Sequence, residues 1–211
     1  MSRLYYFTKM LSFPDELIRL QIQSFKIIHK NRDTKVVVYE LSDIMDKKYI
    51  LKLSPKKEET NDIRNSDNDE IKIWKYLYEK NLAPEVVDYF YVGDIMFLIS
   101  EKAGYSFDIL YDSTDLIPIN LRDDIISSVN KLHDIGIVHG DLGFQNILLS
   151  GTDILFIDFD RSFYINDMPE GRIEYLYEFL GINDEFEDTG EQIVISLDIL
   201  IKREINGVTF F

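Results

Sequence analysis

Short apolar runs separated by polar turns fill most of the first hundred residues, a pattern that is typical of β-strands. The clearest case is a hairpin in which the polar residues 30–33 separate two runs rich in Ile and Val. A second hairpin is expected where Gly93 and Asp94 join two further apolar runs. Strands are therefore predicted at residues 24–29, 34–40, 48–53, 86–92 and 95–99.

Helical periodicity replaces this alternation in two longer segments. Apolar residues recur at helical spacing from Ile71 to Tyr78, with Trp74 and Leu77 between them, and the polar residues 67–69 favour a helix start. A longer helix is expected over residues 121–133, where four apolar residues share one face. Further helices are predicted at residues 14–20, 171–180 and 191–204.

The order of these elements, strands first and helices later, favours an α+β fold. With 211 residues, 45% of them hydrophobic, the chain can form one well-filled core or two small lobes that share a cleft. We expect one domain with an N-terminal lobe at residues 1–100, a hinge at 101–104 and a C-terminal lobe at 105–211.

Composition narrows the classes of partner and compartment. The chain has no cysteine, which excludes disulfides and thiolate metal sites. Its net charge of -15 argues against a nucleic-acid partner, whose phosphates would be repelled. No apolar run reaches the roughly 18 residues of a membrane span, so no transmembrane segment is expected. The N-terminus lacks the features of a signal peptide, and we expect a cytoplasmic protein of undetermined oligomeric state.

Three polar residues in the second half have the spacing of a known chemistry. Asp141 precedes Asn146 by five positions, and Asp158 follows Asn146 by twelve. A turn at residues 150–153 should fold the intervening apolar runs into a hairpin that brings Asp158 beside Asn146. This order and spacing match the catalytic and metal-binding loops of ATP-dependent kinases. The alternative is a hairpin with acidic residues at its ends, which would not explain why the order and the spacing of these residues both match the kinase loops.

The residue types suit phosphoryl transfer with ATP and Mg²⁺. Magnesium prefers a few hard oxygen ligands, which the carboxylate of Asp158 and the amide carbonyl of Asn146 can supply. Asp141 can then accept or orient the proton of an attacking hydroxyl. His139 is expected to brace this loop by hydrogen bonding, the alternative being a buried neutral histidine with no further role.

A lysine and a glutamate in the first half complete the expected nucleotide site. Lys52 lies between two leucines of a predicted strand, where a kinase lysine reaches the ATP phosphates. Such an ammonium needs a carboxylate partner, and Glu70 is the leading candidate, with Asp69 as its competitor. The alternatives are an edge-strand lysine with a solvated head and a glutamate that only complements its helix dipole.

The segments expected to form the hinge and the phosphate loop match kinases less well than the residues that are expected to bind the metal and the phosphates. Backbone groups of Glu101 and Ala103 are expected to bind adenine, unless this segment is an ordinary loop. A glycine-rich phosphate loop should separate the first two strands, but the turn at residues 31–34 has no glycine. Backbone amides, Arg32 or Thr34 would then have to approach the phosphates.

The motifs at residues 139–141 (His-Gly-Asp) and 157–160 (Ile-Asp-Phe-Asp) resemble the kinase-like superfamily outside the conventional protein kinases. Aminoglycoside phosphotransferases, RIO kinases and bacterial lipopolysaccharide core kinases share this pattern. Within that set, the segments at residues 33–36, 49–52 and 174–182 look most similar to the lipopolysaccharide core heptose kinase family. The resemblance implies a small two-lobed protein-kinase-like fold, with an N-terminal antiparallel sheet and helix, a mainly helical C-terminal lobe, and use of ATP and Mg²⁺.

The same resemblance makes a sugar or glycan hydroxyl the leading acceptor, a lipopolysaccharide core heptose above all. The chain after Asp158 has no room for the helical subdomain with which conventional protein kinases hold peptides. The alternatives are a minimal serine/threonine protein kinase, RIO-like or effector-type, and a nucleotide-binding pseudokinase. Asp160 and Arg161 are expected on the acceptor side. There Arg161 would either bind an acceptor phosphate or carboxylate, or form an internal salt bridge with Asp160 or another acid.

Overall fold

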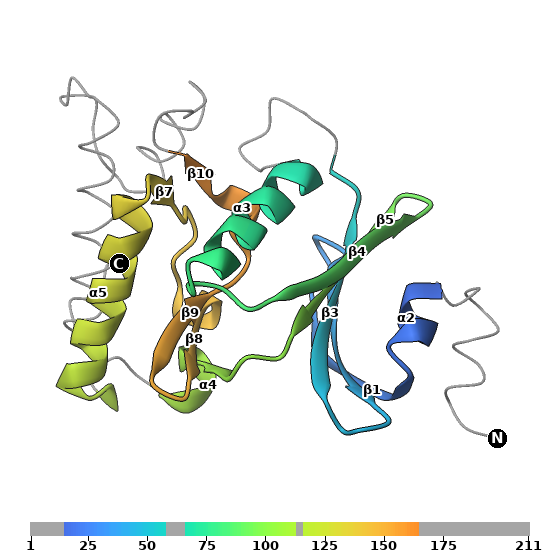
Figure 1. Ribbon diagram of the computed structural model, residues 1–211, viewed down its shortest axis with the longest axis horizontal. Coiled ribbons are helices and arrows are strands. Elements are labelled where there is room, and N and C mark those ends of the chain that lie inside the picture. The colour runs from blue at the N-terminus through green and yellow to red at the C-terminus, as the bar shows by residue number, and fades with distance from the viewer. Residues whose placement is uncertain (1–14, 58–65, 113–115, 165–211) are drawn as a thin grey trace. The chain divides into compact units, whose positions relative to one another are not determined.

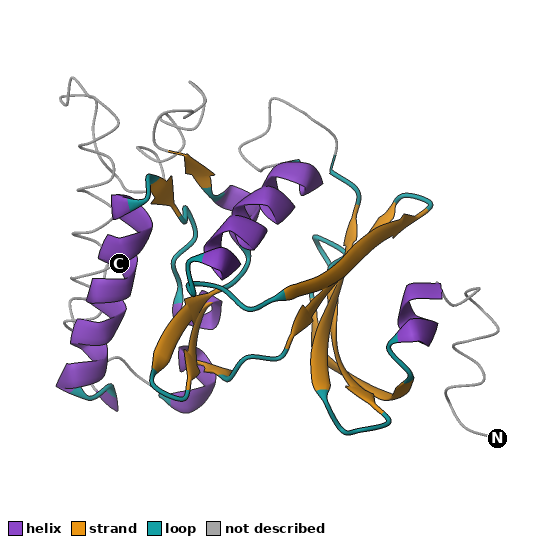
Figure 2. Ribbon diagram, viewed as in Figure 1, coloured by secondary structure: helices purple, strands orange, loops and turns teal. Residues whose placement is uncertain are grey.

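The computed structural model describes residues 15–57, 66–112 and 116–164. Figure 1 labels the helices and strands of this part of the chain, and Figure 2 distinguishes them by type. The helices predicted at residues 171–180 and 191–204 lie outside the described residues.

The chain divides into two compact units. The first unit contains the described residues up to 57 together with residues 84–102. The second contains residues 66–83 and the described residues from 103 onward. The second unit therefore includes a segment that precedes the expected hinge in the sequence.

The first unit is built on a five-stranded antiparallel sheet with the strand order β1-β2-β3-β5-β4. The two predicted hairpins are present, and the second turns at Gly93, whose φ of +58° lies in the left-handed region that favours glycine. All five predicted strands are confirmed, and the second begins and ends three residues later than expected. Their bounds are β1 Ile22–Lys30, β2 Val37–Asp43, β3 Lys48–Pro55, β4 Val86–Val92 and β5 Ile95–Glu101.

One face of this sheet packs against the short helix α2 (Asp15–Arg19), which confirms the first predicted helix. Tyr49 and Leu51 of β3 point into this core. Because side chains alternate along a strand, Lys52 points to the opposite face, and its side chain is half-buried. The core cluster consists of Leu17, Leu41, Tyr49, Leu51, Phe97 and Ile99.

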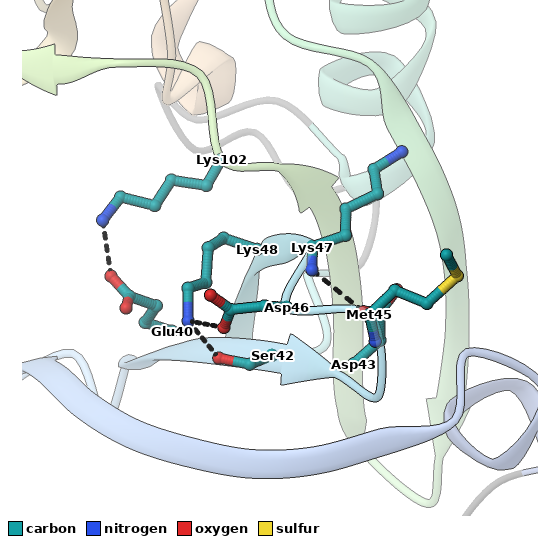
Figure 3. Close-up of polar contacts among 8 residues, drawn as sticks. All are labelled: Glu40, Ser42, Asp43, Met45, Asp46, Lys47, Lys48 and Lys102. Atoms are coloured by element: carbon teal, nitrogen blue, oxygen red, sulfur yellow. Dashed lines mark hydrogen bonds and ion pairs between the residues drawn. The ribbon is translucent and has the colours of Figure 1, made fainter.

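The turn between β2 and β3 is organised by one side chain (Figure 3). The Asp43 carboxylate accepts hydrogen bonds from the backbone N–H groups of Met45 and Lys47, at 2.8 and 2.9 Å. An aspartate side chain that accepts hydrogen bonds from the backbone amides of the residues that follow it favours a tight turn over the continuation of the strand. The turn sets the β2–β3 register, in which Lys52 lies opposite Val38.

The second unit contains two amphipathic helices, α3 (Asp67–Glu79) and α5 (Ile119–Asp134). Both confirm the predicted periodicity, with one exception: Tyr78 is 43% exposed and does not belong to the buried face. Helix α3 begins at Asp67, because the Ser66 hydroxyl caps it by accepting a hydrogen bond from the Asp69 amide at 3.3 Å. None of the helices in the described ranges is long and apolar enough to cross a membrane.

The end of α3 ties this helix to the rest of the second unit. Asn81 adopts a left-handed conformation with φ of +57°, which lets the Leu82 amide bond back to the Leu77 carbonyl at 2.9 Å. The carbonyl of Leu82 then accepts a hydrogen bond from the Phe156 amide at 2.8 Å. Helix α3 is thus fixed to the strand that leads into Asp158.

The described part of the second unit also contains two small sheets. A three-stranded sheet has the order β6-β8-β9, and β7 pairs with β10 in a two-stranded antiparallel sheet. The β8–β9 hairpin confirms the one predicted around residues 150–153. The elements are β6 Tyr105–Ser106, α4 Phe107–Leu110, β7 Ile137–Val138, β8 Ile147–Ser150, β9 Asp153–Phe156 and β10 Phe163–Tyr164, with single 3₁₀ turns η2 at Phe144–Asn146 and η3 at Phe159–Arg161.

Candidate active site

The β8–β9 hairpin brings the two predicted metal-binding residues together. The backbone N–H of Ile157 donates to the carbonyl of Asn146 at 3.0 Å, directly beyond the last pair of the hairpin, Ile147 and Phe156. Asp158 follows at once, with a left-handed backbone at φ 67° and ψ 65°. Aspartate tolerates this conformation better than most residues, because its short polar side chain can bond locally.

The side-chain amide of Asn146 joins this hairpin to the catalytic loop. Its Nδ2 donates to the backbone carbonyl of Asp141 at 2.8 Å and lies 3.4 Å from the carboxylate oxygen Oδ2 of the same residue. Asn146 is 5% exposed, so this direct bond is well shielded from water. With its nitrogen committed to Asp141, the amide offers its carbonyl oxygen as a ligand.

Three carboxylates gather at this point. Asp141, Asp158 and Asp160 each place one oxygen within 4.8 Å of the others, and all three are half-buried. Carboxylate oxygens with a neutral amide oxygen are the donor set that Mg²⁺ prefers, so the residues present fit the predicted ion. Asp160 was expected on the acceptor side. It lies near Asp158 because it is the second residue of the 3₁₀ turn that begins directly after Asp158.

The side chain of His139 connects the loop that carries Asp141 to the residue before Asp158. Its side chain is fully buried, and Nε2 lies 3.0 Å from the carbonyl oxygen of Ile157, to which it donates as the neutral Nε2–H tautomer. Burial lowers the pKa of His139, because a charged imidazolium would lose its hydration. The geometry fits a positioning role, since the ring bonds the backbone between the two loops.

Residues 140 and 162 connect the same two loops, and no pattern in the sequence predicts either contact. The Ser162 hydroxyl donates to the carbonyl of His139 at 2.7 Å. Gly140 has φ of +77°, and a Cβ atom there would collide with the carbonyl of Arg161. Strand β7 pairs with β10 on the far side of these contacts, so the backbones run side by side.

Arg161 forms an ion pair with the predicted catalytic base. Its Nη1 lies 3.3 Å from Oδ1 of Asp141, with side chains 24% and 30% exposed. Of the two roles expected for Arg161, the structure shows the internal salt bridge, with Asp141 as the acid.

Lys52 and Glu70 lie in different units, Lys52 on β3 and Glu70 on α3. Their pairing stays a prediction. The competitor, Asp69, is engaged at the helix start, where it accepts a hydrogen bond from Ser66 at 2.7 Å and pairs with Lys72 at 3.3 Å. Glu70 is fully buried and stays the leading candidate.

The first two hinge residues are held to the sheet of the first unit. Lys102 pairs with Glu40 at 2.6 Å (Figure 3), which lowers the pKa of that carboxyl, and Glu101 forms an ion pair with Lys47. The backbone amides of Glu101 and Lys102 also donate to carbonyls of this unit, at 3.0 and 3.2 Å. Among the described residues, the Ala103 amide has no such backbone partner, which keeps it available for the predicted contact with adenine.

Two backbone amides of the turn between β1 and β2 are bonded within the turn itself. The side chain of Asn31 accepts hydrogen bonds from the amides of Asp33 and Thr34, at 2.9 and 3.1 Å. The approach of another backbone amide, of Arg32 or of Thr34 to the phosphates stays a prediction.

Comparison with known proteins places this site in a family. Residues 17–176 match the RIO domain family, a stretch that contains most of both units and every residue of the candidate site. The chain belongs to the RIO domain family. The predicted kinase-like α+β fold is thereby confirmed, and the family supports the prediction of a phosphotransferase with a hydroxyl acceptor.

Individual relatives match shorter segments. A probable serine/threonine-protein kinase, a BUD32 homolog of Archaeoglobus fulgidus, is 34% identical over 28% of this chain and 30% of its own length. A probable bifunctional tRNA threonylcarbamoyladenosine biosynthesis protein of Methanosarcina barkeri is 36% identical over 31% of this chain and 15% of its own length. A putative serine/threonine-protein kinase of Invertebrate iridescent virus 3 is 37% identical over 28% and 18%, respectively.

The matches cover at most 30% of the length of these three relatives. They revise the predicted ranking of families. The resemblance of residues 33–36, 49–52 and 174–182 ranks the lipopolysaccharide core heptose kinases ahead of the RIO kinases, whereas the matched family is the RIO domain. None of these three relatives is named as a lipopolysaccharide kinase, so a role in lipopolysaccharide synthesis is unsupported.

The close approach at Gly140 generates a first prediction. Gly140→Ala should lower the free energy of unfolding by about 2 to 4 kcal/mol, because the new methyl group meets the Arg161 carbonyl in addition to the cost of a left-handed alanine. Gly136→Ala is the matched control: its φ is also +77°, yet nothing lies within 4 Å of the added atom. It should lose only about 1 kcal/mol. Urea unfolding of both variants measures the difference, and equal losses would contradict the packing described here.

The burial of His139 generates a second prediction. Its pKa is lower in the folded than in the unfolded state, so the unfolded state binds more protons below the ordinary value of about 6.5. The contribution of His139 to stability is therefore complete above about pH 6.5 and falls at lower pH, by up to about 1.4 kcal/mol per pH unit. Urea unfolding between pH 5.5 and 7.5 measures this slope, which His139→Gln should reduce.

Nitrogen-15 NMR provides an independent readout of the same group. As the pH falls below 6.5, the His139 ring should keep one protonated nitrogen, Nε2, and one unprotonated nitrogen, Nδ1, to a lower pH than the exposed His29 does. A His139 ring that becomes doubly protonated at the same pH as His29 would contradict its burial.

Proposed function

We propose that this chain is an ATP- and Mg²⁺-dependent kinase that phosphorylates serine or threonine hydroxyls of proteins. The observation that carries the proposal is the gathering of Asp141, Asn146 and Asp158 within one unit of a RIO domain. The Asn146 amide bonds to the Asp141 carbonyl, and the carboxylates of Asp141 and Asp158 each place an oxygen within 4.8 Å of the other. In a hairpin that carried acidic residues by chance, the Asn146 amide would have no reason to bond to the loop that carries Asp141.

The candidate metal ligands and the candidate base have separable roles. Asp158 and the amide oxygen of Asn146 would hold Mg²⁺, with Asp160 as a further carboxylate nearby. Magnesium would supply charge neutralisation on the phosphates of ATP. Asp141 is oriented by Asn146 and Arg161, and it would accept or orient the proton of the attacking hydroxyl. Catalysis would rest on positioning and electrostatics.

The nucleotide would be held without a glycine-rich loop. The bonded amides of the β1–β2 turn favour a mode in which the phosphates depend on Lys52 and the metal. Lys52 is proposed to pair with Glu70, and the amide of Ala103 is proposed to bind the adenine edge, together with a backbone group of Glu101. Lys52 is a compact point charge, which suits a phosphate that is approached from several directions.

The choice of a protein acceptor is supported by two relatives whose names describe serine/threonine-protein kinases. A minimal serine/threonine protein kinase is one of the alternatives that the sequence leaves open, and these relatives favour it over a kinase with a sugar hydroxyl as acceptor. A sugar kinase and a pseudokinase remain as outcomes that the assay below distinguishes.

The acceptor is tested with γ-labelled ATP and Mg²⁺. We expect the purified chain to transfer label to itself or to generic protein substrates, on serine or threonine, as read by phosphoamino-acid analysis. A panel of core oligosaccharides, assayed in parallel, should take up no label. Label on an oligosaccharide alone would overturn the protein acceptor, and nucleotide binding without transfer to any acceptor would support a pseudokinase.

The division of roles is tested by two isosteric variants. Asp141→Asn should bind Mg²⁺ and ATP almost as the wild type does, while turnover falls by roughly 10² or more, because the proton acceptor is lost. Asp158→Asn should instead lose metal-dependent nucleotide binding, and asparagine suits this position because it also tolerates a left-handed backbone. Calorimetry measures binding and single-turnover kinetics measure transfer. Identical behaviour of the two variants in both measurements would refute the assignment.

A further inference from the structure

Arg161 reaches across from the metal-binding loop to the catalytic loop. The 3₁₀ turn at 159–161 begins directly after Asp158 and ends at Arg161, so the arginine follows the proposed metal ligand by three positions. Its Nη1 lies 3.3 Å from Oδ1 of Asp141. The two paired residues are 20 positions apart in the sequence.

The other oxygen of Asp141 has a donor of its own. Nδ2 of Asn146 lies 3.4 Å from Oδ2, so the two oxygens face two different donors, and the plane of the carboxylate is defined. Both distances exceed the 2.7–2.9 Å typical of a tight charge-assisted bond. The carboxylate is thus oriented by loose contacts, which leave it able to accept a proton.

The backbone of Arg161 has little freedom to move away from Asp141. Its carbonyl lies against Gly140, which has no room for a side chain, and the next residue, Ser162, bonds to the carbonyl of His139 at 2.7 Å. Beyond these contacts, Phe163 of β10 pairs with Val138 of β7. Only the side chain of Arg161 is free to adjust.

The negative charges around Asp141 explain what the ion pair with Arg161 contributes. The carboxylates of Asp158 and Asp160 lie within 4.8 Å of that of Asp141, and like charges at this distance repel. Arg161 opposes this repulsion and draws Oδ1 toward its own side of the site. Without it, Asp141 would be free to rotate, either toward solvent or into the metal site beside Asp158.

We propose that Arg161 is a positioning residue for the catalytic base, and that it ties the orientation of the Asp141 carboxylate to the metal-binding loop. The inference rests on the proposed function, because it assigns Asp141 the role of base. The other role expected for Arg161, binding of an anionic group of the acceptor, is the alternative that the experiment distinguishes.

The test compares Arg161→Gln with Arg122→Gln. Arg122 is a matched control in the same unit: it is also partly buried, but its Nε bonds to the backbone carbonyl of Ile117 at 2.9 Å, a residue that is not part of the candidate site. Arg161→Gln should lower kcat by about 10- to 100-fold, the scale expected when a reacting group is misplaced by about 1 Å. The KM for ATP should change by less than about twofold, because nucleotide binding does not use this contact.

Two further readouts separate positioning from a purely structural role. Methylguanidinium added to Arg161→Ala should restore part of the lost rate, because it supplies the missing cation to a site whose backbone is intact. In an Asp141→Asn background, Arg161→Gln should cause little further loss, because the residue it positions is already gone. The thermal midpoints of the Arg161 and Arg122 variants should be similar.

The outcomes separate this inference from the proposed function. A wild-type protein that transfers phosphate to no acceptor would overturn both. An active wild type with an equally active Arg161→Gln would overturn the inference alone. A raised KM for the acceptor at unchanged kcat would also overturn it, in favour of an acceptor-binding arginine, and additive losses in the double variant would exclude any coupling with Asp141.

Discussion

The hydrogen bonds made by Asn146 connect the parts on which the candidate site depends. Its backbone carbonyl closes the β8–β9 hairpin onto Ile157, and its side-chain amide holds the carbonyl of Asp141. One buried residue therefore links the loop of Asp141, the proposed base, to the strand end that precedes Asp158, the proposed metal ligand. Losing one partner in a buried network leaves the others unsatisfied, so such an arrangement tends to be present as a whole or not at all.

Several local costs are concentrated around this link. Asp158 has a left-handed backbone, Gly140 lies against a carbonyl, and His139 is buried with a lowered pKa. Strained or desolvated groups of this kind persist only where their surroundings hold them, and they cluster at functional sites. Here the surroundings include helix α3, whose Trp74 ring packs edge-to-face on Phe159 at 5.3 Å, so the residue after Asp158 is also held by the core of the second unit.

The sequence predicted those features of the site that depend on periodicity and spacing, and missed those that depend on tertiary contacts. The β8–β9 hairpin and the positions of Asn146 and Asp158 follow from two apolar runs around a polar turn. The β7–β10 pair has only two residues per strand, too few for any alternation to show, and the contact of Ser162 with His139 depends on it. The polar residues 67–69 indicate the start of α3, whereas its cap, the Ser66 hydroxyl, is identified by its contact with the Asp69 amide.

The acceptor was harder to predict than the reaction for a related physical reason. The residues proposed to handle ATP, Mg²⁺ and the proton lie in short motifs, and related families with different acceptors share those motifs because they share the chemistry of the phosphoryl group. Lipopolysaccharide kinases and RIO domains can thus look alike around residues 139–161 while acting on different molecules. An acceptor is selected by the surface that surrounds the transferred group, and short motif spacing carries no information about that surface. The match to the RIO domain extends over residues 17–176, far beyond the motifs, and for that reason it outweighs the motif-level resemblance.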